Sequence, residues 1–165
     1  MGVADADSCP TCSSWKAGEV AGVRVVQWEG PPPEFLYHLT PEFHLRGIKR
    51  AHELRPSARG RGGFSAEGAV EGGISFTDNV REFVEKHPYA WNWRIVRIRT
   101  EEVPGVKPVV YVGGKNIIEQ HQAMEAVRDR GGEARSMHFV KEHEWWTEKT
   151  VPLRPGHFSV SLPLA

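Results

Sequence analysis

Hydrophobic and polar residues alternate over several short stretches of this chain, and such alternation predicts β-strands that are half buried. Residues 22–28 (GVRVVQW) are the clearest case, because valines recur at every second or third position. Proline and glycine clusters separate these stretches and break the chain into short elements. On this basis we expect further strands at residues 35–39, 74–77, 93–100, 106–112, 135–140, 149–153 and 157–162.

Three other stretches have the spacing and the end signals of helices. Thr40 is a suitable cap for a helix that runs to about residue 52, with Pro41 in its first turn. Asp78 and Asn79 precede a second helix at residues 80–86, and two glycines end a third helix at residues 116–130. Strands and helices do not alternate regularly, so the sequence predicts an α+β fold with mainly antiparallel or mixed sheets.

The length of 165 residues suits one compact domain. Residues 1–19 are rich in Ala, Asp, Ser and Gly, and we expect a flexible leader there, followed by a single domain at residues 20–165. Residues 56–73 contain six glycines and few large apolar side chains. This predicts a long loop, and a loop of that length inside a compact domain usually has a function or lacks order.

Lysine plus arginine and aspartate plus glutamate both number 21, so the net charge is zero. A protein that binds nucleic acid through bulk electrostatics is usually basic, which argues against that class. A local basic run exists, and it is either a solvated helix face with a loop or a local contact for nucleic acid. Its members are Arg46, Lys49, Arg50, Arg55, Arg59 and Arg61.

The chain has no apolar stretch near the ~20 residues of a membrane helix and no secretory signal at its beginning, so we expect a cytoplasmic protein that does not contact membranes. Cys9 and Cys12 are the two cysteines, and no second pair is present to complete a zinc site. The histidines show no spacing typical of metal ligands. We therefore predict no metal site.

Three segments present polar groups among apolar neighbours. His38 lies in a strand with Leu36 and Leu39, and Ser75 and Thr77 alternate within the strand at residues 74–77. Because side chains two apart on a strand share a face, Ser75 and Thr77 should point the same way. Glu142 and Glu144 share a face, roughly 7 Å apart, if residues 142–144 are extended.

Each segment alone also fits an ordinary structural role: a hydrogen-bonded core histidine, a plain strand and a solvated strand. Together, the three segments could also supply the groups that a catalytic site for one particular reaction needs. Cleaving a bond between ribose and nicotinamide builds positive charge on the sugar, which a nearby carboxylate stabilises. A hydroxyl residue and a polar side chain on neighbouring strands can hold the rest of the dinucleotide.

The segments YHLT, ISFT and EHEW, in that order, resemble the nicotinamide-binding core of the ADP-ribosyltransferase superfamily. The resemblance implies two small, mostly antiparallel sheets packed around an NAD-binding cleft, with about three helices. It implies transfer of ADP-ribose from NAD to a macromolecular acceptor. The small size suits a toxin, a phage-encoded modifier or a defence protein, and we expect a monomer.

By the same resemblance, Glu144 is the catalytic carboxylate and Glu142 orients the acceptor. His38 contacts the adenosine ribose and is the third catalytic candidate. The remaining residues of the implied NAD pocket are Tyr37, Leu39, Thr40, Ser75 and Thr77.

The chain departs from the superfamily pattern in one respect. Members with a histidine in the first strand usually carry tyrosine in the second motif, whereas this chain carries Ser75-Phe76-Thr77. The acceptor, protein or nucleic acid, is therefore left open. Three alternatives stand beside the transferase: a module that binds a nucleotide or nucleic acid without chemistry, an NAD-consuming RNA 2′-phosphotransferase, and a purely structural or virion-associated protein.

Overall fold

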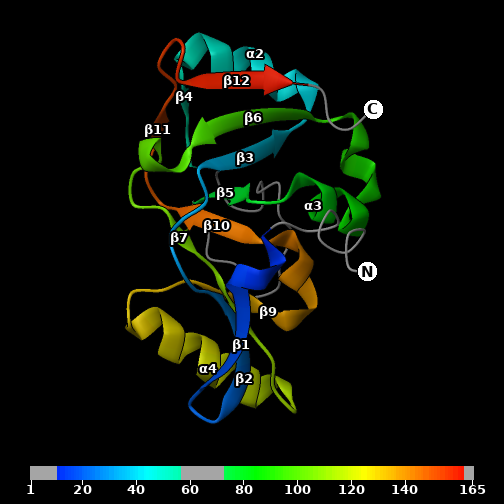
Figure 1. Ribbon diagram of the computed structural model, residues 1–165, viewed down its shortest axis with the longest axis vertical. Helices are drawn as coiled ribbons and strands as arrows, with labels where there is room; N and C mark the ends of the chain where they lie inside the picture. The colour runs from blue at the N-terminus through cyan, green and yellow to red at the C-terminus, as the bar shows by residue number, and fades with distance from the viewer. Residues whose placement is uncertain (1–10, 57–72, 162–165) are drawn as a thin grey trace.

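The computed structural model describes residues 11–56 and 73–161, and its fold is α+β, as the sequence predicts (Figure 1). Its larger sheet has six strands, all paired antiparallel, in the order β12-β6-β3-β5-β10-β7. The bounds are β3 (Phe35–Thr40), β5 (Ile74–Thr77), β6 (Arg94–Arg99), β7 (Lys107–Pro108), β10 (Glu144–Thr147) and β12 (Phe158–Ser161).

A second sheet of four strands has the order β1-β2-β8-β9, in which β8 and β9 are parallel and the other pairs are antiparallel. A two-stranded ladder pairs β4 with β11. The bounds are β1 (Trp15–Val20), β2 (Val23–Trp28), β4 (Glu53–Leu54), β8 (Val110–Val112), β9 (Ala134–Ser136) and β11 (Val151–Pro152).

The helices connect these strands. The α-helices are α2 (Glu42–Ala51), α3 (Val80–Lys86) and α4 (Ile117–Asp129). Short 3₁₀ segments are η1 (Cys12–Ser14), η2 (Pro88–Asn92), η3 (Thr100–Glu102) and η4 (Met137–Glu142). Asn79 and Asn116 cap α3 and α4, because each side chain accepts a hydrogen bond from the backbone N–H three residues later.

The smaller sheet lies between α4 and the edge of the larger sheet (Figure 1). One of its faces, which includes Val25 and Val112, packs on the apolar side of α4. The opposite face presents Trp15 and Tyr111 to Trp145 of β10. The alternation of the strands therefore builds two cores from one sheet.

The larger sheet also buries both faces near its centre. On one side, Leu36 and Phe76 join Val96 in the main core, below 1% exposed. On the other side, Leu39 packs against Phe83 of α3. Burial of these side chains supplies most of the driving force that fixes the register of β3 and β5.

Asp78 fastens the first strand to the core. Its Oδ2 accepts hydrogen bonds from the indole N–H groups of Trp15 and Trp145, each at 2.9 Å, and its Oδ1 lies 3.1 Å from His143 Nδ1. Residues 15–19, which the sequence places in a flexible leader, are therefore part of a sheet. Trp15 is the physical reason, because its ring is buried and its N–H is satisfied inside the protein. Residues 1–10 lie outside the described residues.

Three other local predictions are wrong. Thr40 does not cap α2, because Pro41 occupies the cap position and the Thr40 hydroxyl donates to the Pro41 carbonyl. Residues 106–112 form two strands in different sheets, since Val109 N–H donates to Glu144 and Val110 N–H donates to Glu133. Residues 135–140 are strand only to Ser136, whose hydroxyl accepts from His138 N–H and starts η4.

The contact between Gly73 and Trp146 yields a test of this packing. A Cβ at Gly73 would overlap the Trp146 indole ring, which is itself buried. Gly73→Ala should therefore lower the free energy of unfolding by about 1–3 kcal/mol, measured by urea titration. Gly18→Ala is the matched control, because the nearest atom to its added Cβ is 3.9 Å away. Equal free energies of unfolding for the two variants would contradict the described contact between Gly73, just before β5, and Trp146.

Candidate functional site

The three sequence motifs lie on adjacent strands of the larger sheet, in the order β3, β5, β10. The register pairs Tyr37 with Thr77 and Thr77 with Glu144, so these three residues form one row across the sheet. The row continues to Arg97 on β6. Because paired residues point to the same face, Tyr37, Thr77 and Glu144 leave the sheet on one side.

Ser75 links the second motif to the third. Its Oγ donates a hydrogen bond of 2.7 Å to Glu144 Oε2. Ser75 and Thr77 share a face of β5, as the alternation predicts, and Phe76 lies in the core on the other face. The Thr77 hydroxyl is engaged locally, because it donates to the Asn79 carbonyl and accepts from Asn79 N–H.

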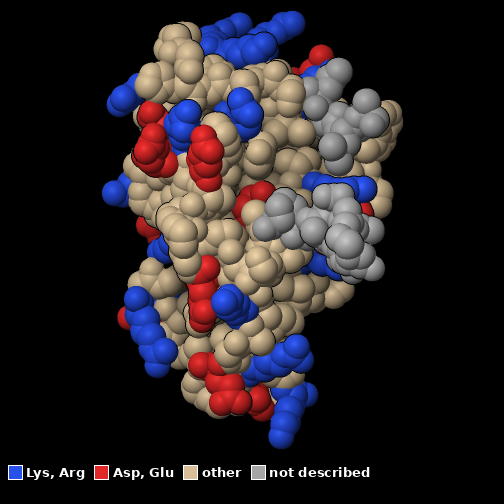
Figure 2. Space-filling view, in the orientation of Figure 1, with Lys and Arg blue, Asp and Glu red and all other residues tan. Residues whose placement is uncertain are grey.

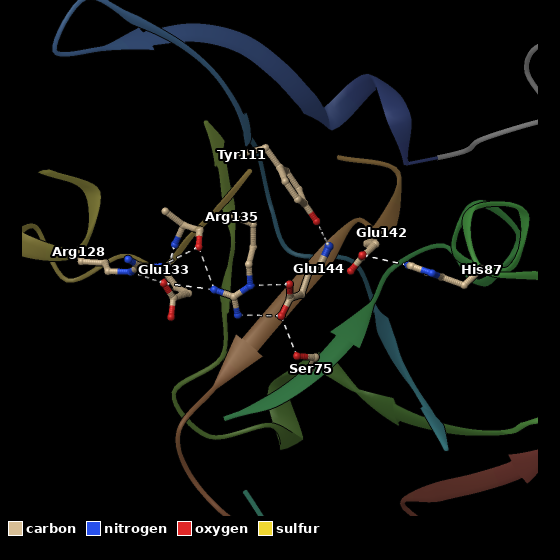
Figure 3. Close-up of polar contacts among 9 residues, drawn as sticks. Ser75, His87, Tyr111, Arg128, Glu133, Arg135, Glu142 and Glu144 are labelled. Carbon is tan, nitrogen blue, oxygen red and sulfur yellow. Dashed lines mark hydrogen bonds and ion pairs between the residues drawn. The ribbon is translucent and has the colours of Figure 1, made fainter. Parts of the chain in front are cut away.

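Arg135 binds Glu144 with two parallel hydrogen bonds. Nε donates to Oε1 and Nη2 donates to Oε2, both at 3.1 Å, and both side chains are at most 2% exposed. Figure 3 shows the chain of contacts continuing from Arg135 to Glu133, at 3.2 Å, and to Arg128, 2.7 Å from Glu133. This bidentate geometry holds the Glu144 carboxylate in one orientation.

Burial and ion pairing oppose each other at Glu144. Removal from water raises the pKa of the Glu144 carboxyl, while Arg135 and the Ser75 hydroxyl lower it. Burial disfavours the Arg135 cation too, yet Glu144 and Glu133 outweigh this and raise the pKa of Arg135. Arg135 therefore stays protonated, and its charge favours the ionised form of Glu144 against a net rise in the Glu144 pKa that burial causes.

The backbone at Glu144 is fixed as well. Its N–H donates a hydrogen bond of 2.7 Å to the hydroxyl oxygen of Tyr111, which lies on the smaller sheet. Burial, reinforced by the Glu144 charge, raises the pKa of Tyr111 well above its ordinary value, so the hydroxyl stays protonated. Side chain and backbone of Glu144 are thus both held by the smaller sheet.

His38 leaves β3 on the opposite face from Tyr37 and Glu144. Its ring centroid lies 5.6 Å from that of Phe76, and its Nδ1 lies 2.8 Å from the Ser75 carbonyl oxygen. A carbonyl only accepts, so Nδ1 carries the proton. Burial lowers the pKa of His38, although the bond to Ser75 opposes this, so the ring is neutral at pH 7.

His38 and Glu144 therefore both contact Ser75, from opposite faces of the sheet, and do not face each other across a cleft. Ser75 contacts His38 through its carbonyl and Glu144 through its hydroxyl. Among the other first-strand candidates, Tyr37 is half-buried, whereas Leu39 and Thr40 are buried. Tyr37 and Leu39 share the Glu144 face of β3, and Tyr37 is the more accessible of the two.

Glu142 and Glu144 do not share an extended strand. Glu142 ends η4, and His143 adopts a left-handed backbone conformation with φ of 46°, so β10 begins only at Glu144. This turn sends the Glu142 side chain toward α3, where Oε1 lies 3.0 Å from His87 Nε2. Burial raises the pKa of Glu142, and the contact with His87 opposes the rise.

Several residues around the two glutamates have no feature in the sequence that marks them as part of a functional site. His87 and Arg135 are ordinary polar residues next to predicted elements, and Tyr111 lies in an unremarkable apolar run. His87 contacts a residue 55 positions away, and Tyr111 contacts one 33 positions away. Only the topology brings them together, so periodicity and spacing could not identify them.

The basic run is not one continuous surface in the described residues. Arg46, Lys49 and Arg50 are exposed on α2, while Arg55 pairs with Glu53 at 2.9 Å. Figure 2 shows acidic and basic side chains interspersed on the visible face, with basic ones also gathered over α2 at the top. Arg59 and Arg61, and most of the predicted loop at residues 56–73, lie outside the described residues.

No protein-family model, no curated protein and no solved structure matches this chain. Within residues 11–56 and 73–161, no group of three or more His, Cys, Asp or Glu side chains could hold a metal ion. In the same part of the chain, no helix has the length and apolar character needed to cross a membrane. The local geometry is therefore the basis for any functional proposal.

The ion pair between Arg135 and Glu144 generates a test by double substitution. Arg135→Met leaves the Glu144 carboxylate buried without its counter-ion and should lower the free energy of unfolding by about 3–5 kcal/mol. Adding Glu144→Met removes the stranded charge and should recover most of that loss. Urea unfolding of the four proteins measures the coupling, and additive effects of the two substitutions would contradict the described pair.

Proposed function

We propose that this protein transfers ADP-ribose from NAD⁺ to an acceptor, as the resemblance of its three motifs suggests. The proposal rests mainly on one observation: the three motifs lie on adjacent strands in their order along the chain. They do so although His38 and Ser75 are 37 positions apart in the sequence, and Ser75 and Glu144 are 69 positions apart. Ser75, the bridging residue, contacts both His38 and Glu144. Ser75 lies on β5, between β3 and β10, so the central motif is next to both of the others.

In this proposal Glu144 acts through its fixed negative charge. Cleavage of the bond between nicotinamide and ribose develops positive charge on the sugar, and an oriented carboxylate in a dry site stabilises that charge. Arg135 and Ser75 hold the carboxylate in place before the reaction, so little reorganisation is needed. The departing nicotinamide keeps the electron pair of the broken bond and leaves as a neutral molecule.

Tyr37 is the residue of the first motif best placed to contact nicotinamide. It stands in the same row as Thr77 and Glu144 and keeps part of its ring accessible. A flat aromatic ring at that position offers a stacking surface for the nicotinamide ring. The Ser75 hydroxyl, now bonded to Glu144, is the group that a ribose hydroxyl would replace.

A second function is a nucleotide-binding module without chemistry. The observation that favours it is the state of Glu144, which is fully buried and has both oxygens engaged by Arg135 and Ser75. A carboxylate in such a setting also serves to join two sheets, independently of any substrate. The two functions differ in whether bound NAD⁺ is consumed.

Release of nicotinamide from labelled NAD⁺ distinguishes them. The wild-type protein should release nicotinamide, and Glu144→Gln should reduce the rate by about 10²–10³-fold, because the charge that stabilises the transition state is lost. Glu148→Gln, at an exposed position four residues later, is the matched control and should react like the wild type.

Circular dichroism and thermal melting of each variant show whether it is folded. Should Glu144→Gln fail to fold, Ser75→Ala removes one hydrogen bond to the carboxylate and should still reduce the rate. Absence of release by the wild type, or equal release by folded Glu144→Gln, would remove the transferase proposal. Binding of NAD⁺ without its consumption would favour the binding module.

A further inference from the structure

Glu142 carries a buried oxygen that the rest of the described chain does not use. The residue is 0% exposed, and Oε1 is engaged by His87. Within residues 11–56 and 73–161, Oε2 of Glu142 has no hydrogen-bond partner. A buried carboxylate oxygen in this state costs free energy, and a hydrogen-bond donor from a bound water or ligand would lower that cost.

His87 is held from its other side by Tyr89. The Tyr89 hydroxyl lies 3.3 Å from Nδ1 of His87, and Nε2 of the same ring faces Glu142. A carboxylate only accepts, so Nε2 carries the proton and Nδ1 accepts from the Tyr89 hydroxyl. Tyr89, His87 and Glu142 therefore form one chain of hydrogen bonds that starts at a residue 54% exposed and ends at a buried carboxylate.

Figure 3 shows Glu142 with His87 on one side and Glu144 on the other. Only Oε1 is joined by a dashed line to His87, and Oε2 is left on its own. The charge of Glu142 acts on Glu144 and raises its pKa, so Glu142 lies within electrostatic reach of the carboxylate that the proposed function assigns to the reacting sugar. Exposed Tyr89 lies at the outer end of the chain.

From this geometry we propose that Tyr89 and His87 position Glu142 as the base for a hydroxyl acceptor of ADP-ribose, an inference that rests on the proposed function. In the step, Oε2 of Glu142 takes the proton of the acceptor O–H group, and the acceptor oxygen bonds to the anomeric carbon of the ribose. The bond from that carbon to nicotinamide breaks, and its electron pair leaves with nicotinamide. The proton on Glu142 then passes to water.

The number of Glu142 carboxylate oxygens that can bind an acceptor determines which chemical class of acceptor fits. A guanidinium group binds a carboxylate best through two parallel hydrogen bonds, which require both carboxylate oxygens. Glu142 offers only Oε2, because His87 holds Oε1. A single O–H group, of water or of a macromolecule, needs one oxygen and fits the site.

The charges around Glu142 determine how the site responds to pH. Burial raises the pKa of Glu142, and hydrogen bonding and charge from His87 lower it. Activity should therefore fall as the pH drops through a pKa above the ordinary carboxyl value, and loss of His87 should move this acidic limb to higher pH. The other titratable groups that act on or lie beside Glu142 are Lys86, Tyr89, Tyr111, Arg135 and Glu144.

The first experiment measures kcat for conversion of NAD⁺ to ADP-ribose, with water as the acceptor, between about pH 5 and 9. His87→Gln should lower kcat on the order of 10- to 100-fold at the acidic end, with partial recovery at high pH. Tyr89→Phe removes only the hydroxyl and should shift the limb in the same direction by less. His121→Gln, an exposed histidine on α4, is the matched control and should keep the wild-type profile.

A pH profile of His87→Gln and Tyr89→Phe that coincides with the wild type would overturn the inference, because a purely structural contact does not set the acidic limb. A second assay adds agmatine, a soluble guanidinium compound, as an acceptor that competes with water. Formation of ADP-ribosyl-agmatine faster than hydrolysis would also overturn the assignment of a hydroxyl acceptor. The expected product is ADP-ribose alone.

An independent readout separates this inference from the proposed function. Nitrogen–proton correlation spectra of the histidine rings report which nitrogen carries the proton, without any turnover. Wild-type His87 should be protonated at Nε2, and Glu142→Gln should give a mixture of tautomers, because an amide can donate as well as accept. The expected spectra with no nicotinamide release would mean that the proposed function has failed. Release with protonation of His87 at Nδ1 would mean that only the positioning of Glu142 has failed.

Discussion

The buried ion pair between Arg135 and Glu144 joins the four-stranded sheet to the six-stranded sheet, and the site depends on it. Arg135 lies on β9 of the smaller sheet and Glu144 begins β10 of the larger one. Two charges out of water stabilise a fold only when their partners are complete, and here Ser75 and Glu133 complete them. The same contacts that fix the relative position of the sheets also fix the carboxylate.

The two glutamates of the third motif have different environments, and this difference gives them different possible roles. Glu144 is saturated by Arg135 and Ser75, so it is suited to act through a fixed charge. Glu142 is anchored at one oxygen only, by His87, and is suited to exchange a proton. Burial raises the pKa of both groups, and their partners set how far that rise is opposed.

The local elements could largely be predicted from the sequence, since alternation and capping act over a few residues. The strand with Ser75 and the helix capped by Asn79 have the expected bounds. Long-range features could not be predicted in this way. Trp15 joined the sheet because Asp78 accepts its N–H, and Glu142 left the strand because His143 is left-handed. Such outcomes depend on partners distant in sequence, which no short pattern contains.

The central claim is that NAD⁺ reaches the pair of carboxylates at the start of β10. Glutamate labelled with ¹³C at the side-chain carboxyl, with assignments from Glu142→Gln and Glu144→Gln, lets both groups be observed during a titration with NAD⁺. The account predicts that both resonances move and saturate along one binding curve. Binding of NAD⁺ that leaves both resonances in place, or no binding at all, would contradict it.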